Sequence, residues 1–295
     1  MATATGTGTA DATAATTKNS TTVLDKEIKK VPMTAFVLDI AGSESTGGAG
    51  CQADLRTFHQ LGVYGTCALT CIVAFDPAHN WDHRFVPIDA DVLKNQVEAS
   101  TACWDIDTAK IGMLGTVPVI DATAEILDDH KFSNVVVDPV LICKGQEPGA
   151  ALDIDNVLRE KILPLATVLT PNMFETKTLS GMAEINTVEE MAEAAKIIAQ
   201  QGPKAVLVKG GVHLPGDDAV DVLWDGEEIH VYSEPKVAGV LVSGAGDSLA
   251  AAVAAELAKG ADLHTAVAHA KAFVTAGINK RLTAGTPFEV VWQGE

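Results

Sequence analysis

Short apolar runs alternate along the chain with segments that carry apolar residues at helical spacing. Runs such as TAFVLDIAG (34–42) and NVVVDPVL (134–141) are nearly continuous in Val, Ile and Leu, which is typical of strands buried on both faces. Segments such as VPVIDATAEILDDH (117–130) place apolar residues three and four apart, which predicts helices. The alternation predicts an α/β fold with a mainly parallel sheet covered by helices on both faces.

The same periodicity of apolar residues predicts the other strands and helices from residue 33 onward. Strands are predicted over 34–42, 67–75, 107–114, 134–141, 166–172 and 204–211. Helices are predicted over 51–62, 89–100, 117–130, 173–181, 187–202, 247–260 and 263–278. The segment 219–234 predicts a hairpin that turns at Asp225-Gly226.

The first residues differ in composition from the rest. Residues 1–32 are rich in Ala, Thr and Gly, without the apolar block of a signal peptide, and we interpret them as a disordered or loosely attached arm. Residues 33–295 then form one domain, because no later segment has the composition of a linker.

Net charge and cysteine content restrict the class of protein. The formal charge of −18 argues against nucleic-acid or anionic-membrane partners, which need clustered Lys and Arg. No window approaches the roughly 18 apolar residues of a membrane span. Five irregularly spaced cysteines indicate reduced thiols in a cytoplasmic protein, with Cys67 and Cys71 as small core residues.

Candidate chemistry gathers where the predicted strands end. In SGAGDS (243–248), Gly244, Ala245 and Gly246 form a tight turn that exposes backbone N–H groups at a helix start, which favours an anion site. Asp247 lies beside that site and could accept the proton of an attacking hydroxyl group. The alternative is an ordinary helix cap, for which aspartate is a favoured residue.

A second Gly-rich turn, ESTGGAG (44–50), precedes the helix predicted at 51–62. Its glycines allow close approach of backbone to a ligand, although a plain strand-to-helix turn would look the same. The spacing fits neither a Walker-type phosphate loop nor a dinucleotide-binding fingerprint.

Three further strand ends carry charged or amide side chains. Asp138 suits Mg²⁺ or a phosphate-bound water, and Lys209 could reach a phosphate or simply be solvated. Asn172 and Glu175 have the spacing of a capping box, which is the structural interpretation. The functional interpretation is that the Glu175 carboxylate organises Mg²⁺ around a triphosphate.

The ordered series IAGSESTGGAGCQADLRTFHQLGVYG, KIGML, VVVDPVLICKG, LTPNMFE, VLVKGG and GAGDSLAAAVAAELAKG resembles the ribokinase-like vitamin kinases, in particular the pyridoxal and hydroxymethylpyrimidine kinase group. The resemblance extends from about Met33 to about Lys280. It implies a ribokinase-like three-layer α/β/α sandwich with a small lid at Cys143–Gly149. It also implies a homodimer and phosphorylation of a CH₂OH group by ATP with Mg²⁺, and it leaves a requirement for a monovalent cation such as K⁺ open.

The resemblance also implies roles for individual residues. Gly244, Ala245 and Gly246 match the anion hole, and Asp247 the residue that takes the proton. The residues that match the ATP and metal side are Asn172, Glu175, Lys209 and Asp138, with Asp138 and Glu175 toward the metal ion. The residues that match the wall of the ring pocket are Gly42, Ala49, Asp54, Met113 and Val140.

Two departures from the group's pattern bear on the substrate. Phe75 stands where the pyrimidine kinases usually have a glutamine, and it can stack on a ring but cannot pair with the pyrimidine's polar edge. This favours vitamin B6 (pyridoxal, pyridoxine or pyridoxamine) as the small-molecule substrate. Asp247 stands where the pyridoxal branch commonly has a cysteine, so a thiolate adduct with the aldehyde of pyridoxal is unavailable at that position. The other cysteine of that branch, on the lid, is present here as Cys143, and the resemblance assigns it to the substrate pocket.

Three alternatives remain from the sequence. The first is a hydroxymethylpyrimidine (phosphate) kinase, and the second is a non-catalytic nucleotide- or B6-binding regulator, against which the intact Asp247, Glu175 and Lys209 argue. The third, a sugar or nucleoside kinase, would not predict the AGSESTGGAG turn (41–50).

Overall fold

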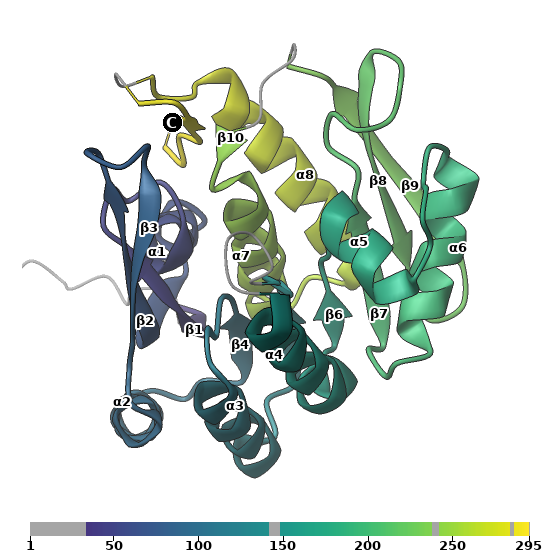
Figure 1. Ribbon diagram of the computed structural model, residues 1–295. Helices are drawn as coiled ribbons and strands as arrows, with labels where there is room; N and C mark the ends of the chain where they lie inside the picture. Colours follow the sequence, from purple (N-terminus) through teal and green to yellow (C-terminus); the bar gives the residue numbers. More distant parts are fainter. Residues whose placement is uncertain (1–33, 142–147, 238–241, 284–285, 295) are drawn as a thin grey trace, which may run out of the picture. The chain divides into compact units, whose positions relative to one another are not determined.

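The computed structural model describes residues 34–141, 148–237, 242–283 and 286–294, with side chains omitted for 148–152. The predicted arm (1–32), Cys143 and most of the predicted lid lie outside these residues. Residues 34–295 make up one compact unit. Within the described part of the chain, nine strands form one sheet in the order β3-β2-β1-β4-β5-β6-β7-β8-β9, and a separate two-stranded sheet pairs β10 with β11 (Figure 1).

The strands are β1 (Phe36–Glu44), β2 (Tyr64–Asp76), β3 (Asp82–Pro87), β4 (Thr108–Ile111), β5 (Asn134–Val137), β6 (Val168–Leu169), β7 (Ala205–Lys209), β8 (Asp218–Trp224), β9 (Ile229–Pro235), β10 (Val242–Ser243) and β11 (Glu289–Val290). The helices are α1 (Gly50–Gln60), α2 (Ala90–Cys103), α3 (Val117–His130), α4 (Pro148–Lys161), α5 (Met173–Ser180), α6 (Val188–Ala199), α7 (Ala245–Ala258) and α8 (Leu263–Asn279), with a 3₁₀ turn at Leu163–Leu165.

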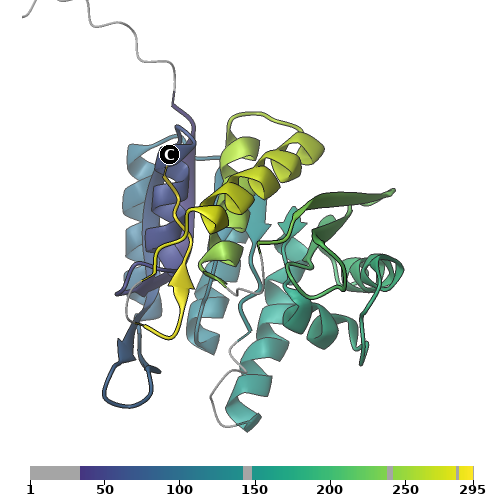
Figure 2. The same cartoon turned by 90° about the horizontal axis from the view of Figure 1, so that it is seen from above.

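The five strand pairs from β2 to β7 are parallel, whereas the pairs at the edges, β2–β3, β7–β8 and β8–β9, are antiparallel. Successive residues of the central strands enter different cores. Leu38 packs with α2–α6 on one face, whereas its neighbour Val37 packs with α1, α7 and α8 on the other. This confirms the three-layer α/β sandwich, and α7 and α8 lie side by side on one face of the sheet (Figure 2).

Helix α7 packs closely onto the sheet because its buried face is built from small residues. Its residues from Ser248 to Glu256 are all buried, and most of them are alanine. Small side chains allow the helix axis to approach the strands closely, which holds its amino end in a fixed position at the carboxyl edge of the sheet.

Most predicted elements are present, and the hairpin turns at Asp225 as expected. The sequence analysis missed three strands and one helix of the described residues. Strand β3 was not predicted, yet it pairs antiparallel with β2 from Pro87 to Asp82. The reading also missed α4 and the short pair β10–β11. Among the described residues, no helix is both long and apolar enough to cross a membrane, and the four described cysteines are free thiols.

Candidate active site

Segments that are far apart in the sequence meet at the carboxyl edge of the parallel strands. Lys209, the last residue of β7, donates from Nζ to Asp138 Oδ1 over 2.7 Å, and Asp138 directly follows β5. Gly246 in the first turn of α7 faces this pair. A Cβ atom built on Gly246 would lie 3.1 Å from Lys209 Nζ and 3.7 Å from Asp138 Oδ2. The fold thus brings these three predicted residues together where open α/β sheets bind ligands.

The start of α7 requires glycine. Gly244 is the N-cap residue, with φ of 78° in the left-handed region, and it supplies no side chain to cap the helix. A Cβ atom on Gly244 would lie 2.0 Å from the carbonyl oxygen of Gly48, a distance that no side chain permits. The first N–H groups of a helix have no acceptor within the helix, and with the helix dipole they favour an anion. Together with Ala245 and Gly246, this turn can therefore bind a phosphate group.

The loop between β1 and α1 is organised by Glu44. Its carboxylate accepts from the backbone N–H and the hydroxyl of Thr46, both at 2.6 Å, and from the N–H of Gly48 at 3.0 Å. These bonds fix the Gly48 carbonyl against Gly244. Sequence reasoning missed this role, and the signal for it is a carboxylate placed just before a run of Ser, Thr and Gly.

Asp247 is held by the same loop. The N–H of Gly50 donates to Asp247 Oδ1 over 3.1 Å, so the two predicted Gly-rich turns are in direct contact. Gly50 has φ of 61°, and a Cβ atom on it would lie 2.4 Å from the carbonyl oxygen of Gly42. The Asp247 side chain is thereby oriented beside the phosphate-binding turn, half-buried.

Asn172 and Glu175 form a capping box at the start of α5. Asn172 Oδ1 accepts from the N–H of Glu175 at 3.0 Å, and Glu175 Oε2 accepts from the N–H of Asn172 at 2.8 Å. The structural alternative is therefore confirmed. The N–H of Lys209 also donates to the Pro171 carbonyl over 2.8 Å, which ties β7 to this turn.

Glu175 also acts electrostatically on the site. Burial lowers the pKa of Lys209, but the charges of Asp138 and Glu175 outweigh that effect and raise it, so the lysine stays cationic. Asp138 and Glu175 thus place carboxylates around one ammonium group at the edge of the phosphate-binding turn. Oxygen donors of this kind fit Mg²⁺.

Gly42 and Met113 of the predicted ring pocket are neighbours. A Cβ atom on Gly42 would lie 3.2 Å from Met113 Cε and 2.6 Å from the Sγ atom of Cys71. Only glycine leaves room at this point between the two sulfur-containing side chains. Ala49 is the N-cap of α1 and Val140 follows Asp138, and both are half-buried.

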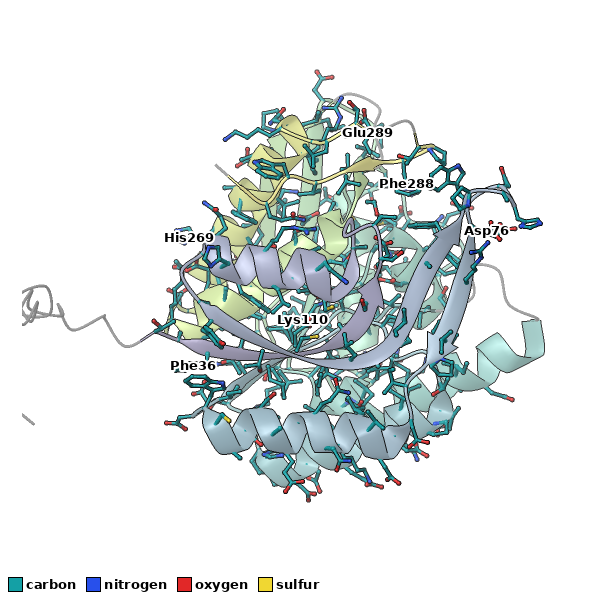
Figure 3. All side chains as sticks on the ribbon, turned by 90° about the vertical axis from the view of Figure 1, so that its left-hand side faces the viewer. Phe36, Asp76, Lys110, His269, Phe288 and Glu289 are labelled. Carbon is teal, nitrogen blue, oxygen red and sulfur yellow. The ribbon has the colours of Figure 1, made fainter. Side chains whose placement is uncertain are left out.

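Asp54, which the resemblance assigns to the wall of the ring pocket, takes part in a buried ion pair. The side chain is fully buried, and its Oδ2 atom accepts from Lys110 Nζ over 2.6 Å. Lys110 of β4 is itself fully buried, and an ammonium group inside the protein needs a carboxylate beside it. The ion pair between Asp54 and Lys110 therefore joins α1 to β4 inside the protein, and Figure 3 shows Lys110 in the interior.

A second carboxylate, Asp39, completes this buried cluster. Asp39 lies opposite Lys110 in the register of β1 and β4, and its Oδ1 atom is 4.0 Å from Lys110 Nζ. Burial raises the pKa of Asp39 to about 6, against the pull of Lys110, and raises the pKa of Asp54 well above its ordinary value. The cluster holds two carboxyls but one ammonium group, so a proton on one carboxyl would leave it without net charge.

The cluster also feels the charge of Asp247. Besides the larger effect of burial, the charge of Asp247 raises the pKa values of both Asp39 and Asp54. Gly112 shows that the lysine reaches toward the carboxyl edge, because a Cβ atom there would lie 2.9 Å from Lys110 Nζ. The charge of Asp247 beside the phosphate-binding turn thus acts on the buried carboxyls.

Phe75 belongs to an aromatic group beside the β2–β3 hairpin. Its ring centroid lies 4.7 Å from that of Phe288 and 4.8 Å from that of His83. Phe288 comes from the C-terminal segment and lies near the tip of the hairpin (Figure 3). The ring of Phe75 is thus held by neighbours at the carboxyl end of β2.

A helix start open to an anion, the half-buried Lys209 and flanking carboxylates lie together at this edge of the sheet, and groups of this kind suit phosphoryl transfer. The fold and this arrangement place the chain among the ribokinase-like kinases.

The chain belongs to the phosphomethylpyrimidine kinase family, whose sequence profile matches residues 44–292. It is 46% identical over 243 residues to a pyridoxine kinase of Bacillus subtilis, covering 82% of this chain and 90% of the relative. The solved ADP complex of Bacillus subtilis pyridoxal kinase superposes with a TM-score of 0.84 at 43% identity, covering 88% of this chain and 97% of that one. Staphylococcus aureus pyridoxal kinase, solved with AMP-PCP and pyridoxal, gives a TM-score of 0.81 at 38% identity, covering 88% and 94%.

Proposed function

We propose that this protein transfers the γ-phosphoryl group of ATP to the 5′-hydroxymethyl group of a vitamin B6 vitamer: pyridoxal, pyridoxine or pyridoxamine. Two findings support the proposal. Relatives that match over most of their length include pyridoxine and pyridoxal kinases, and one of these was solved with pyridoxal and an ATP analogue.

The amino end of α7 is proposed to bind the migrating phosphoryl group. The N–H groups of Ala245 and Gly246 are directed at developing negative charge by the helix geometry. Lys209, 11% exposed and paired with Asp138, adds a fixed positive charge next to this turn. Such preorganised groups stabilise charge spread over the phosphoryl oxygens in the transition state.

Asp247 is proposed to orient the substrate hydroxyl group and to take its proton. The N–H of Gly50 occupies Oδ1, which holds the carboxylate beside the phosphate-binding turn. In a loose transition state the proton moves late, so positioning by Asp247 matters more than its strength as a base.

Asp138 and Glu175 are the residues proposed to hold Mg²⁺. When bound with the nucleotide, the ion would neutralise charge on the phosphates. A monovalent cation such as K⁺ is a further proposal that rests on resemblance alone.

The substrate ring is proposed to bind near Gly42, Met113 and Phe75. Phe75 offers an aromatic face and no amide, which favours a pyridine ring over a pyrimidine that needs a polar partner. A hydroxymethylpyrimidine (phosphate) kinase is the second candidate, because the family profile that matches the chain is that of phosphomethylpyrimidine kinase.

The observation that carries the proposal is the convergence of Asp247, Gly246 and the Lys209–Asp138 pair on one turn. The test is an ADP-release assay with pyridoxal, pyridoxine, pyridoxamine and hydroxymethylpyrimidine as separate acceptors. We expect release with the B6 vitamers to exceed release with the pyrimidine. Preference for the pyrimidine would select the second candidate, and no release with any acceptor would overturn the kinase assignment.

The domain organisation and assembly are proposed from the sequence. Residues 33–295 would carry the activity and residues 1–32 would be dispensable, so deletion of the first 30 residues should leave kcat unchanged. The homodimer rests on the family resemblance and is tested by sedimentation of the purified protein, whereas the cytoplasmic location rests on the cysteine content of the sequence.

A further inference from the structure

Two histidines and an aspartate lie together at the far end of the sheet from the active site. Asp225 begins the β8–β9 turn, His230 lies in β9 and His264 lies in the first turn of α8. Because β8 runs antiparallel to β7, this turn lies at the amino edge of the parallel strands. The hairpin and α8 are neighbours (Figure 1).

The donor atoms of the three residues converge. Asp225 Oδ2 lies 3.0 Å from His230 Nε2 and 3.3 Å from His264 Nε2. One ligand atom from each of the three residues lies within 4.8 Å of the other two. The two imidazole rings have centroids 4.1 Å apart, inclined at 62°, so both present a ring edge to the same carboxylate oxygen.

The Asp225 carboxylate is prepared for this role by its own turn. Its Oδ1 atom accepts from the N–H groups of Glu228 at 2.7 Å and Glu227 at 2.8 Å, which leaves Oδ2 facing the histidines. These backbone bonds, with His230, lower the pKa of Asp225 to about 2. The group is therefore an anion at neutral pH, as a metal-binding carboxylate must be.

His264 has an outer partner that orients its ring. Its Nδ1 atom lies 3.2 Å from the hydroxyl oxygen of Tyr232 on β9. With the proton on Nδ1 and directed at that hydroxyl, Nε2 carries the free lone pair and points at Asp225. Metal-binding histidines are typically oriented in this way by an acceptor on the other ring nitrogen.

We propose that Asp225, His230 and His264 bind one divalent transition-metal ion, of the Zn²⁺ type, that links the β8–β9 hairpin to α8. Donor atoms of a tetrahedral zinc site are about 3.3 Å apart, close to the distances that join Asp225 Oδ2 to the two ring nitrogens. Two imidazoles and one carboxylate suit zinc rather than Mg²⁺ or Ca²⁺, which take oxygen ligands. Three protein ligands leave the fourth position to water.

The surroundings favour a cation. The side chains of Glu227, Glu228 and Asp262 are exposed around the cluster, and Tyr232 is its neutral neighbour. A simpler alternative uses the same geometry: protonated histidines would form ion pairs with Asp225 without a metal ion. The experiment must distinguish these two cases.

The test is zinc binding to the full-length protein after treatment with a chelator, measured by isothermal titration calorimetry and by the visible spectrum of the Co²⁺ form. We expect one equivalent of Zn²⁺, a Co²⁺ spectrum with nitrogen and oxygen ligands and without sulfur charge transfer, and a higher Tm with the ion present. His264→Gln and His230→Gln should each weaken the affinity more than tenfold. Tyr232→Phe should weaken it by about tenfold, as loss of an outer partner does.

The matched control is His269→Gln, an exposed histidine of the same helix, which should bind zinc like the wild type. The proposal is overturned if the wild type binds no zinc, or if the two ligand variants bind it as the wild type does. It is also overturned if zinc leaves Tm unchanged while His230→Gln and His264→Gln lower Tm only at low pH, because the cluster would then be an ion pair alone.

Discussion

The N–H of Gly50 donates to Asp247 Oδ1 over 3.1 Å, although the two residues are 197 positions apart in the sequence. This bond joins the loop after β1 to the amino end of α7. The bond orients the Asp247 carboxylate, which is proposed to face the substrate hydroxyl group. The loop that donates it lies beside the predicted ring pocket. Substrate-side and phosphate-side parts of the site are thus positioned together.

Asp247→Asn should lower kcat strongly and change the KM for ATP little. The amide keeps the size of the side chain but removes the proton acceptor, a contribution of about 10²–10⁴-fold in comparable cases. Steady-state kinetics with saturating B6 vitamer measures both constants. Asp89→Asn is the control, because Asp89 caps α2 through its side chain and asparagine caps equally well. A variant at 247 that keeps most of its kcat would remove this residue from the proposed role.

Gly244→Ala should lower both stability and activity. The new Cβ atom would meet the Gly48 carbonyl at 2.0 Å, so the start of α7 or the Gly-rich loop must shift, at an expected cost of about 1–3 kcal/mol in addition to the left-handed strain. Gly260→Ala measures the left-handed strain alone, without the close contact. Gly260 also has positive φ, 87°, but nothing lies within 4 Å of its Cβ position, so only about 1–2 kcal/mol should be lost. Urea unfolding of both variants gives the comparison, and equal losses would contradict the close contact.

The order of strands and helices could be predicted because periodicity and turn residues are local signals. β3 was missed because HRFVP follows a polar turn and its residues are half-buried or exposed, so it lacks the apolar run of a buried strand. The site was found through glycine and aspartate at strand ends, which is also local. The buried cluster was not found, since no local pattern says that Asp39 and Lys110 face each other. The available signal was a charged residue inside each of two apolar strands, Asp39 and Lys110. Only the pairing register of these strands shows that the two charges face each other.

Lys110→Met should destabilise the protein by about 3–5 kcal/mol, because it leaves the buried carboxyls of Asp39 and Asp54 without their cation. Lys94→Met is the control. Lys94 pairs with Glu125 over 2.5 Å, but both side chains are exposed, so its loss should leave stability almost unchanged. Chemical denaturation at neutral pH measures both variants. Similar small effects for the two lysines would argue against a charged Lys110.

Asp39→Asn should change how stability depends on pH. The pKa of Asp39 is about 6 in the folded protein and 3.8 ordinarily, so the folded state binds more protons in between and loses stability as the pH rises through this range. The asparagine variant lacks this titration and leaves Lys110 paired with Asp54. Its stability relative to the wild type should therefore increase by up to about 3 kcal/mol between about pH 4 and about pH 7. Denaturation curves across this range, with the exposed Asp128→Asn as control, measure the difference, and a flat difference would contradict the raised pKa.

Glu175→Gln separates the two roles that Glu175 can have. Glutamine can still accept the N–H of Asn172 in the capping box, so the Tm should change little. The lost charge should raise the Mg²⁺ concentration needed for half-maximal activity by about tenfold, if the carboxylate contributes to the metal side as proposed. The chain offers a close control in Glu190, which makes the same capping box with Thr187 at the start of α6. Glu190→Gln should leave both the Tm and the Mg²⁺ titration unchanged, and an unchanged Mg²⁺ titration in Glu175→Gln as well would reduce Glu175 to a helix cap.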